Sequence, residues 1–130
     1  MIEAGIVAFL RADATVSALL GTRIYPVTIP ENKRTWPALT YQSITASQEF
    51  TIDAHRVSTK RIQFDSYAST YGDAKRVLDV IGRVLSAYAG TLPDGTRVLF
   101  AENSIETDFF ESDGRDYRCI CEYEFTYVTP

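Results

Sequence analysis

Apolar residues recur every three to four positions in three stretches of the chain, and this spacing predicts three helices. Two short helices are expected near the N-terminus, over residues 2–12 and 14–20, with Asp13 capping the second and Gly21 ending it. The third is expected over residues 70–88, where one broad apolar stripe would extend for about 28 Å at about 1.5 Å per residue. A helix of that kind covers one face of a small sheet.

Alternating apolar and polar residues predict strands over residues 38–45 and 61–68 and two longer strands near the C-terminus. Three prolines interrupt the segment between the second helix and the first of these strands, which therefore has room only for a short edge strand near Arg23–Tyr25. Residues 47–58 show no period and are predicted to form a long loop. Ser112-Asp113-Gly114 indicates the turn of a C-terminal β-hairpin.

The alternation in the hairpin also predicts its register. Ile105 and Phe109 are expected to face the core, while the acidic residues between them face solvent. Directly opposed residues share a face, so a three-residue loop with Gly114 in the left-handed conformation keeps both strands matched. That register places Asp108 opposite Arg118 and predicts a cross-strand pair between them.

Together these elements predict one α+β domain over residues 1–130. The expected sheet is antiparallel or mixed, with four or five strands, N-terminal helices and one long helix packed on one face, and a C-terminal β-hairpin. Apolar residues make up 45% of the chain, which is enough to bury a core without a disulfide or a structural metal. No apolar run approaches the length of a membrane span, so no membrane association is expected.

The charge of the chain argues against a protein that grips nucleic acid, because the formal net charge is −4 and the pI is about 4.9. The acidic residues are concentrated in the second half and on the predicted hairpin. A field of one sign either serves solubility or repels polyanions such as DNA. The candidate residues for such a field are Glu102, Glu106, Asp108, Glu122 and Glu124.

Residues with catalytic or metal-binding chemistry are sparse. Cys119 and Cys121 share one strand face and are expected to pack in the core as small apolar side chains. A zinc site would need about two further ligands, and His55 is the only histidine. No serine lies in a nucleophile-elbow motif, and no glycine-rich phosphate loop is present. We therefore expect no enzyme activity, no cofactor and no metal.

Several segments, taken in order, resemble the tail completion (tail terminator) proteins of long-tailed bacteriophages. A helix ending in Ala14–Gly21 runs directly into Thr22–Pro26, a proline precedes the strand in Trp36–Tyr41, and Arg61–Ala68 leads into a helix at Tyr71–Ala74. The resemblance covers nearly the whole chain, and the order and spacing of the segments carry it. It brings no catalytic residue with it.

The resemblance implies a structural role at the tail–neck junction of a virion, with assembly in the host cytoplasm. Proteins of this family form a ring, typically of six copies, that ends polymerisation of the tail tube and joins the tail to the head. The implied partners are other copies of the chain, the major tail tube protein and a head-completion or neck protein, while DNA passes through the ring without specific binding. The acidic residues named above are candidates for lining that hole. Candidates for the subunit or tube interface are Phe50, Ile52, His55 and Arg56.

Two other functions remain open at this stage. One is a different neck component, such as a connector or stopper between portal and tail. The other is a small-ligand-binding or enzymatic α+β domain, because a fold does not fix a function. A deep apolar pocket with convergent polar groups would favour that second alternative.

Overall fold

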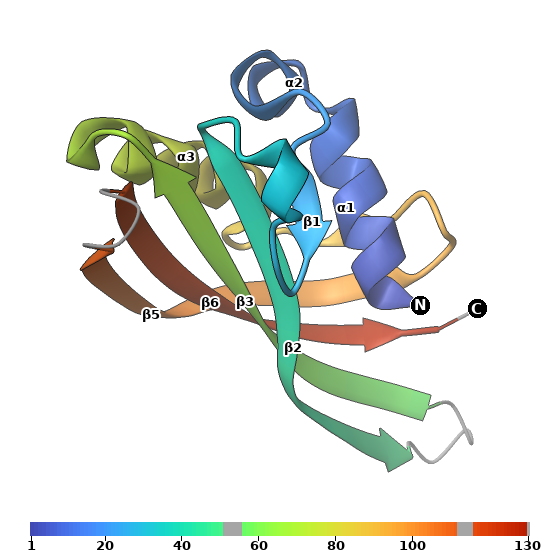
Figure 1. Ribbon diagram of the computed structural model, residues 1–130. Coiled ribbons are helices and arrows are strands. Elements are labelled where there is room, and N and C mark those ends of the chain that lie inside the picture. Colours follow the sequence, from blue (N-terminus) through green and yellow to red (C-terminus); the bar gives the residue numbers. More distant parts are fainter. Residues whose placement is uncertain (51–55, 112–115, 130) are drawn as a thin grey trace.

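The computed structural model describes residues 1–50, 56–111 and 116–129 (Figure 1). The helices are α1 (Ile2–Ala12), α2 (Ala14–Leu20) and α3 (Tyr71–Leu85), with a short 3₁₀ helix, η1, at Glu31–Lys33. The strands are β1 (Ile24–Pro26), β2 (Ala38–Phe50), β3 (Arg56–Ala68), β4 (Gly90–Thr91), β5 (Arg97–Glu111) and β6 (Asp116–Val128).

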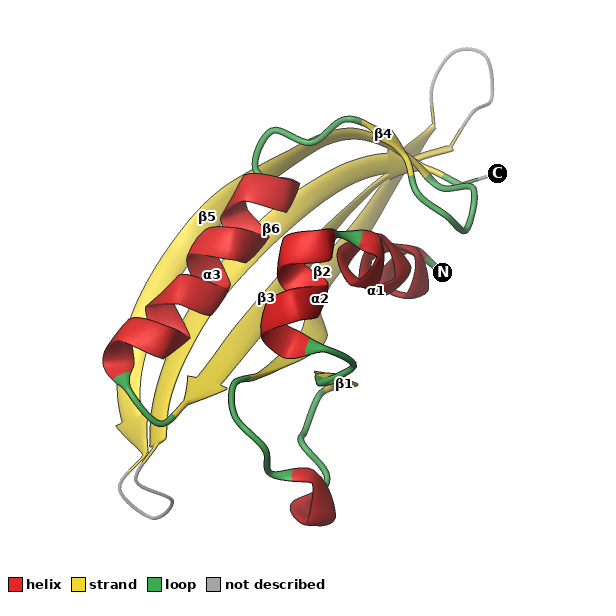
Figure 2. Ribbon diagram, turned by 90° about the horizontal axis from the view of Figure 1, so that it is seen from above, coloured by secondary structure: helices red, strands yellow, loops and turns green. Residues whose placement is uncertain are grey.

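All six strands form one curled sheet in the order β1-β2-β3-β6-β5-β4. Strand β1 pairs with β2 in parallel and the other neighbours are antiparallel, so the sheet is mixed. Helices α1, α2 and α3 lie on one face, here called the inner face, and the opposite face, called the outer face, carries none of the three (Figure 2). The α+β class is confirmed, and β1 lies where the short edge strand was predicted. The described residues contain six strands instead of the predicted four or five, because β4 has only two residues and shows no alternating pattern.

The core lies between the inner face and the helices. Phe64, Tyr123 and Phe125 from the sheet are fully buried there, as are Leu10 of α1 and Ile81 of α3. Burial of one such side chain contributes roughly 1.5–3 kcal/mol. The apolar stripes that predicted the helices are therefore the surfaces that fix them to the sheet.

Helix α2 begins and ends at the capping residues that the sequence predicts. The carboxylate of Asp13 accepts hydrogen bonds from the backbone N–H groups of Thr15 and Val16, at 2.9 and 3.0 Å. Gly21 ends α2 with a positive φ of 57°, which glycine adopts without strain. Helix α3 ends at Leu85 rather than at the predicted residue 88, because the chain turns extended at Ser86.

The predicted loop over residues 47–58 is wrong in most of its length. Strand β2 continues to Phe50 and β3 begins at Arg56, with Ser47 paired to Thr59 within the ladder. This end of the β2–β3 hairpin projects beyond the helices (Figure 1). Residues 43–47 are accordingly exposed, and a strand that is solvated on both faces shows no alternation of apolar and polar residues.

The predicted cross-strand pair in the C-terminal hairpin is also wrong. Asp108 lies opposite Cys119, and Phe109 lies opposite Arg118. The register shifts between Val98 and Phe100 and again between Asn103 and Ile105. Each irregularity inserts one residue into β5, and one inserted residue exchanges the faces of all the side chains that follow.

The second bulge therefore reverses the predicted faces of β5. Ile105 and Phe109 lie on the outer face instead of in the core, and both are exposed. Glu106 and Asp108 lie on the inner face, opposite the buried Cys121 and Cys119.

Candidate assembly surfaces

The acidic residues of the hairpin are divided between the two faces of the sheet. On the inner face, Asp108 accepts a hydrogen bond from the Tyr71 hydroxyl at 2.8 Å and one from Lys75 at 3.3 Å. Lys75 Nζ also lies 3.9 Å from Glu106. These contacts attach the end of β5 to the first turns of α3.

The contacts at Lys75 shift the pKa of both partners. The Tyr71 hydrogen bond and the Lys75 charge lower the pKa of Asp108, against a smaller opposing effect of desolvation. Partial burial lowers the pKa of Lys75, but Asp108 and Glu106 outweigh it and the pKa is raised overall. Both groups are therefore charged at neutral pH, and this part of the acidic surface is partly neutralised.

On the outer face, Arg118 joins three strands. Its Nε donates to Asp65 Oδ2 at 2.9 Å, its Nη2 lies 2.7 Å from the same oxygen, and its Nη1 donates to Glu111 Oε1 at 3.2 Å. The guanidinium also lies over the rings of Tyr67 and Phe109, at 5.9 and 5.8 Å. Burial lowers the pKa of Arg118, but the carboxylates of Asp65 and Glu111 outweigh this effect, so the pKa is raised overall.

The segment that precedes β2 completes this cluster. Trp36 stacks on Tyr67 with ring centroids 5.7 Å apart, and its indole N–H donates to Asp116 at 2.8 Å. A hollow of about 300 Å³ lies beside it, lined by Thr28, Ile29, Arg34, Tyr67, Glu111, Asp116 and Arg118. Its lining mixes both charges and it opens to solvent, so it lacks the enclosed apolar character of a small-ligand site.

The other predicted acidic residues also lie on the outer face. Arg61 lies 3.9 Å from Glu122 and 3.4 Å from Glu124, which are on the neighbouring strand β6. Glu102 of β5 lies opposite Glu124 and is exposed. The outer face thus keeps three of the five acidic candidates, two of them beside a basic partner.

Two of the predicted interface residues, Phe50 and Arg56, lie at the far end of the β2–β3 hairpin. Phe50 and Arg56 are opposed in the last pair of the ladder. Arg56 is exposed. Ile52 and His55 fall outside the described residues. This end of the sheet and the Glu111–Asp116 end of the β5–β6 hairpin lie at opposite ends of the molecule (Figures 1 and 2).

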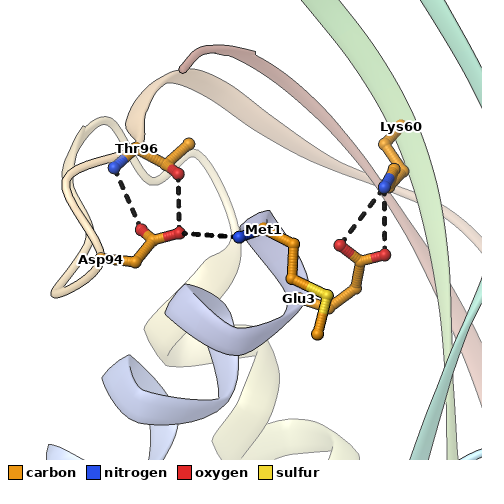
Figure 3. A network of polar contacts seen from close by, with 5 residues as sticks. All are labelled: Met1, Glu3, Lys60, Asp94 and Thr96. Carbon is orange, nitrogen blue, oxygen red and sulfur yellow. Dashed lines mark hydrogen bonds and ion pairs between the residues drawn. The ribbon is translucent and has the colours of Figure 1, made fainter. Parts of the chain in front are cut away.

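The start of α1 is fixed to the sheet by Glu3 (Figure 3). Its carboxylate accepts hydrogen bonds from Lys60 Nζ at 3.0 and 3.2 Å and from the Ser43 hydroxyl at 2.7 Å. Burial raises the pKa of Glu3, but the Ser43 and Lys60 contacts outweigh it and hold the pKa below its ordinary value. This contact attaches α1 to both β2 and β3.

A second contact holds the same end of α1 (Figure 3). Asp94 accepts hydrogen bonds from the backbone N–H and the hydroxyl of Thr96, at 3.0 and 2.9 Å, and lies 3.8 Å from the Met1 amino group. Gly5 faces this carboxylate so closely that a Cβ there would overlap it. The absence of a side chain at Gly5 lets the β4–β5 turn approach the helix.

Cys119 and Cys121 are buried and free, as the strand period predicts. Burial raises the pKa of Cys119 to about 11 and that of Cys121 to about 12. A thiol with such a pKa is protonated and inert at neutral pH. Within residues 1–50, 56–111 and 116–129, no three His, Cys, Asp or Glu side chains are grouped to hold a metal ion. None of the described helices is long and apolar enough to cross a membrane.

Sequence reasoning missed the main exposed apolar surface of the described chain. Five of the nine large apolar side chains exposed among the described residues belong to β5, and Phe110 is the most exposed of the five, at 55%. They are Leu99, Phe100, Ile105, Phe109 and Phe110. The alternating pattern assigned Ile105 and Phe109 to the core, and only knowledge of the bulges would have placed them outside.

A curled mixed sheet with helices on one face and a strand with exposed apolar side chains is the kind of surface that suits contact with other chains. Residues 4–128 match the family described as tail completion protein gp17, and the chain belongs to that family of structural phage tail proteins. A chain in the virion of the native gene transfer agent particle has the same fold, with a TM-score of 0.80 at 14% identity over 98% of this chain and 94% of that one. No curated protein matches this chain.

Proposed function

We propose that this chain is the tail terminator, a subunit of a ring of six copies that caps the head-proximal end of the tail tube and joins it to the head. The family match over residues 4–128 carries the proposal. The fold shared with a chain of a virion particle supports a place in the virion. The exposed apolar strand supports a chain that is completed by contacts with other chains.

The experiment that tests this function is electron microscopy of particles made without the gene. A terminator is required to stop tube growth, so we expect overlong tails beside separate, filled heads. Tails of normal length on intact particles would overturn the proposal. Tails of normal length beside filled, unjoined heads would instead favour the alternative of a connector or stopper on the head side.

We also propose that the acidic surface of the β5–β6 hairpin lines the hole through which DNA passes. Glu102, Glu122 and Glu124 share the outer face, whereas Glu106 and Asp108 face α3 and contact Lys75. A negative wall lets DNA slide because it repels the phosphates. The five residues lie on two faces of the sheet, so only part of this acidic surface can line the hole, and the proposal is tested on the three residues of the outer face.

The test replaces Glu102 and Glu124 together by lysine and compares the variant with a Glu102→Gln, Glu124→Gln control. The lysines should bind phosphate and slow DNA ejection in particles that still assemble, whereas the glutamines should have a much smaller effect. Equal ejection rates in the two variants would refute a lumen-lining role for this face.

The end of the β2–β3 hairpin, with Phe50, Ile52, His55 and Arg56, is our proposed contact with the tail tube or a neighbouring subunit. The position of the described ends of β2 and β3 supports this role, because they project away from the helices and the core (Figure 1). The double variant Phe50→Ala, Ile52→Ala should reduce tail assembly without lowering the thermal stability of the free protein. Normal assembly of the variant would refute the contact.

A further inference from the structure

Two strands of the sheet have long edges that no described strand covers. Strand β4 pairs with β5 only at Arg97 and Val98, and the backbone N–H of Ala87 bonds to Ala101. From Glu102 to Glu111 the outward edge of β5 is open among the described residues. Strand β1 pairs with β2 only up to Tyr41, so the edge of β2 is open from Gln42 onward. Open edges present unpaired backbone N–H and C=O groups that can pair with another strand.

The side chains of β5 favour a partner along this edge. Three of its exposed apolar residues lie within the open segment, Ile105 and Phe109 on the outer face and Phe110 on the inner face. Burying them against another chain removes them from water and stabilises the complex by roughly 25 cal/mol for each Å² of apolar surface.

The charges decide which strand fits. The segment Glu102–Glu111 contains four acidic residues and no basic one. Two copies of β5 paired with each other would place acidic residues against acidic residues, and opposed like charges destabilise a strand pair. The segment Gln42–Ser47 contains no charged residue, is exposed from Ser43 to Ser47, and includes the exposed Ile44.

We propose that the open edge of β5 pairs with the open edge of β2 from a second copy of this chain. Two different surfaces then meet in each contact, which is the head-to-tail arrangement that a ring requires. The strand order alternates in direction from β2 through β3 and β6 to β5. A neighbouring β2 added to β5 by rotation about an axis along the strands is therefore antiparallel to it, and the sheet continues from one subunit to the next.

Strand β4 covers the start of β5, and strand β1 covers the start of β2. Because these two covered parts lie at opposite ends of the sheet, the pairing between subunits is staggered along the strands. Through β3 and β6, Gln42 is level with Ile105, and the open segment of β2 extends from there away from the open segment of β5. Aligning the open segment of β5 with the open segment of β2 shifts one subunit relative to the next by about five residues, or roughly 16 Å along the strand. A sheet that closes on itself has such a stagger, with its strands tilted to the axis.

Photo-crosslinking in assembled particles tests the pairing directly. One variant carries p-benzoylphenylalanine in place of Phe109, a second carries it in place of Ile44, and a control carries it in place of the exposed Arg76 on α3. Irradiation should join Phe109 to the β2 segment of another copy, and Ile44 to its β5 segment. Within one chain the two strands lie at opposite sides of the sheet, so such a link is intermolecular. Links to β5 itself or to another protein, links matched by the control, or no links at all would overturn the proposal.

A charge test needs no modified residue. Ile44→Glu and Ile44→Lys remove the same apolar side chain and differ only in the sign of the added charge. Opposite an acidic β5, the glutamate variant should be strongly depleted from particles when it competes with the wild-type chain, whereas the lysine variant should be retained. Equal incorporation of the two variants would refute an acidic strand as the partner, and thermal unfolding of each free variant verifies that it folds.

This inference specifies the contact between subunits of the proposed ring. It rests on the proposed function only for the number of copies. The two experiments can fail separately. A β5–β2 link in particles that contain the chain, together with tails of normal length in particles made without the gene, would retain the pairing and refute the terminator. Overlong tails in particles made without the gene, together with no such link in particles that contain the chain, would retain the terminator and refute the pairing.

Discussion

Replacing Arg118 by methionine should destabilise the protein more than replacing any exposed ion-pair partner. The carboxylate of Asp65 accepts one hydrogen bond from Arg118 Nε and one from Gln63 at 2.8 Å, and it forms an ion pair with Arg118 Nη2 at 2.7 Å. The side chain of Asp65 is only 7% exposed. Removing one partner of a buried pair costs about 3–5 kcal/mol, because the other charge stays buried. Arg118 is 31% exposed, so water reaches part of the vacated space, and we expect about 2–3 kcal/mol.

Urea unfolding at neutral pH, followed by far-UV circular dichroism, measures this cost. A loss of 2–3 kcal/mol corresponds to a fall in melting temperature of about 8–12 °C for a chain of this length. Lys75→Met is the matched control, because it removes a lysine from an exposed pair with Asp108 and should cost less than about 1 kcal/mol. Adding Asp65→Asn to Arg118→Met should recover part of the stability, since the buried carboxylate is then removed and only the more exposed Glu111 is left without Arg118. A cost equal to that of the control, or additive effects in the double variant, would refute a buried pair.

Three further predictions concern the rest of the chain. Gly5→Ala should lower the free energy of unfolding by about 1–2 kcal/mol, because its Cβ would meet Asp94, although alanine is the better helix former; unchanged stability in urea would contradict the close approach. The lowered pKa of Glu3 means that its contribution to stability is present above the unfolded-state pKa of about 4.3 and is lost as the pH falls through the folded-state pKa. The wild type should therefore lose more stability than Glu3→Gln on acidification, and parallel pH curves would refute this. Cys119 and Cys121 should resist thiol reagents at about pH 8 until the protein unfolds, because both are buried with raised pKa values; labelling of the folded protein would mean that the sheet opens at β6.

The helices were predictable because each has a local cause. The apolar stripe of α3 faces the sheet, and Thr70 begins it by accepting a hydrogen bond from the backbone N–H of Asp73, at 3.2 Å. Asp13 begins α2 in the same way. Such caps depend on residues two or three positions apart, so the sequence contains the whole interaction. The end of α3 was less predictable, because Tyr88 continues the apolar period but packs on Phe9 from beyond the helix.

The strands were predictable only where one face is buried. In β6, Cys119, Tyr123 and Phe125 face the core, and the alternation gave the strand and its face correctly. Residues 43–47 of β2 are exposed, and the chain from residue 47 onward was predicted as a loop. The two-residue strand β4 owes its conformation to β5, with which it pairs, so it leaves no pattern of its own in the sequence.

The bulge between Asn103 and Ile105 limits what sequence could say about the candidate surfaces. A strand with one inserted residue keeps the same residue types in the same order, so the alternation remains visible after the bulge while its meaning is reversed. The apolar residues beyond it were therefore assigned to a core that they do not enter. The acidic residues were likewise grouped on one face, although Asp108 contacts Lys75 on the other.

The same bulge separates stability from assembly in this chain. Beyond it, Ile105 and Phe109 contribute little to the core, because β5 passes α3 with Glu106 and Asp108 turned inward. Folding of the single chain gains almost nothing from keeping large apolar side chains at these exposed positions, whereas a neighbouring chain that covers them gains their burial. Substitutions on this part of β5 should therefore reduce association and leave the unfolding transition nearly unchanged, which is the opposite of what substitutions at Phe64 or Phe125 should do. That difference is what distinguishes an assembly surface from a core when both are built from the same residue types.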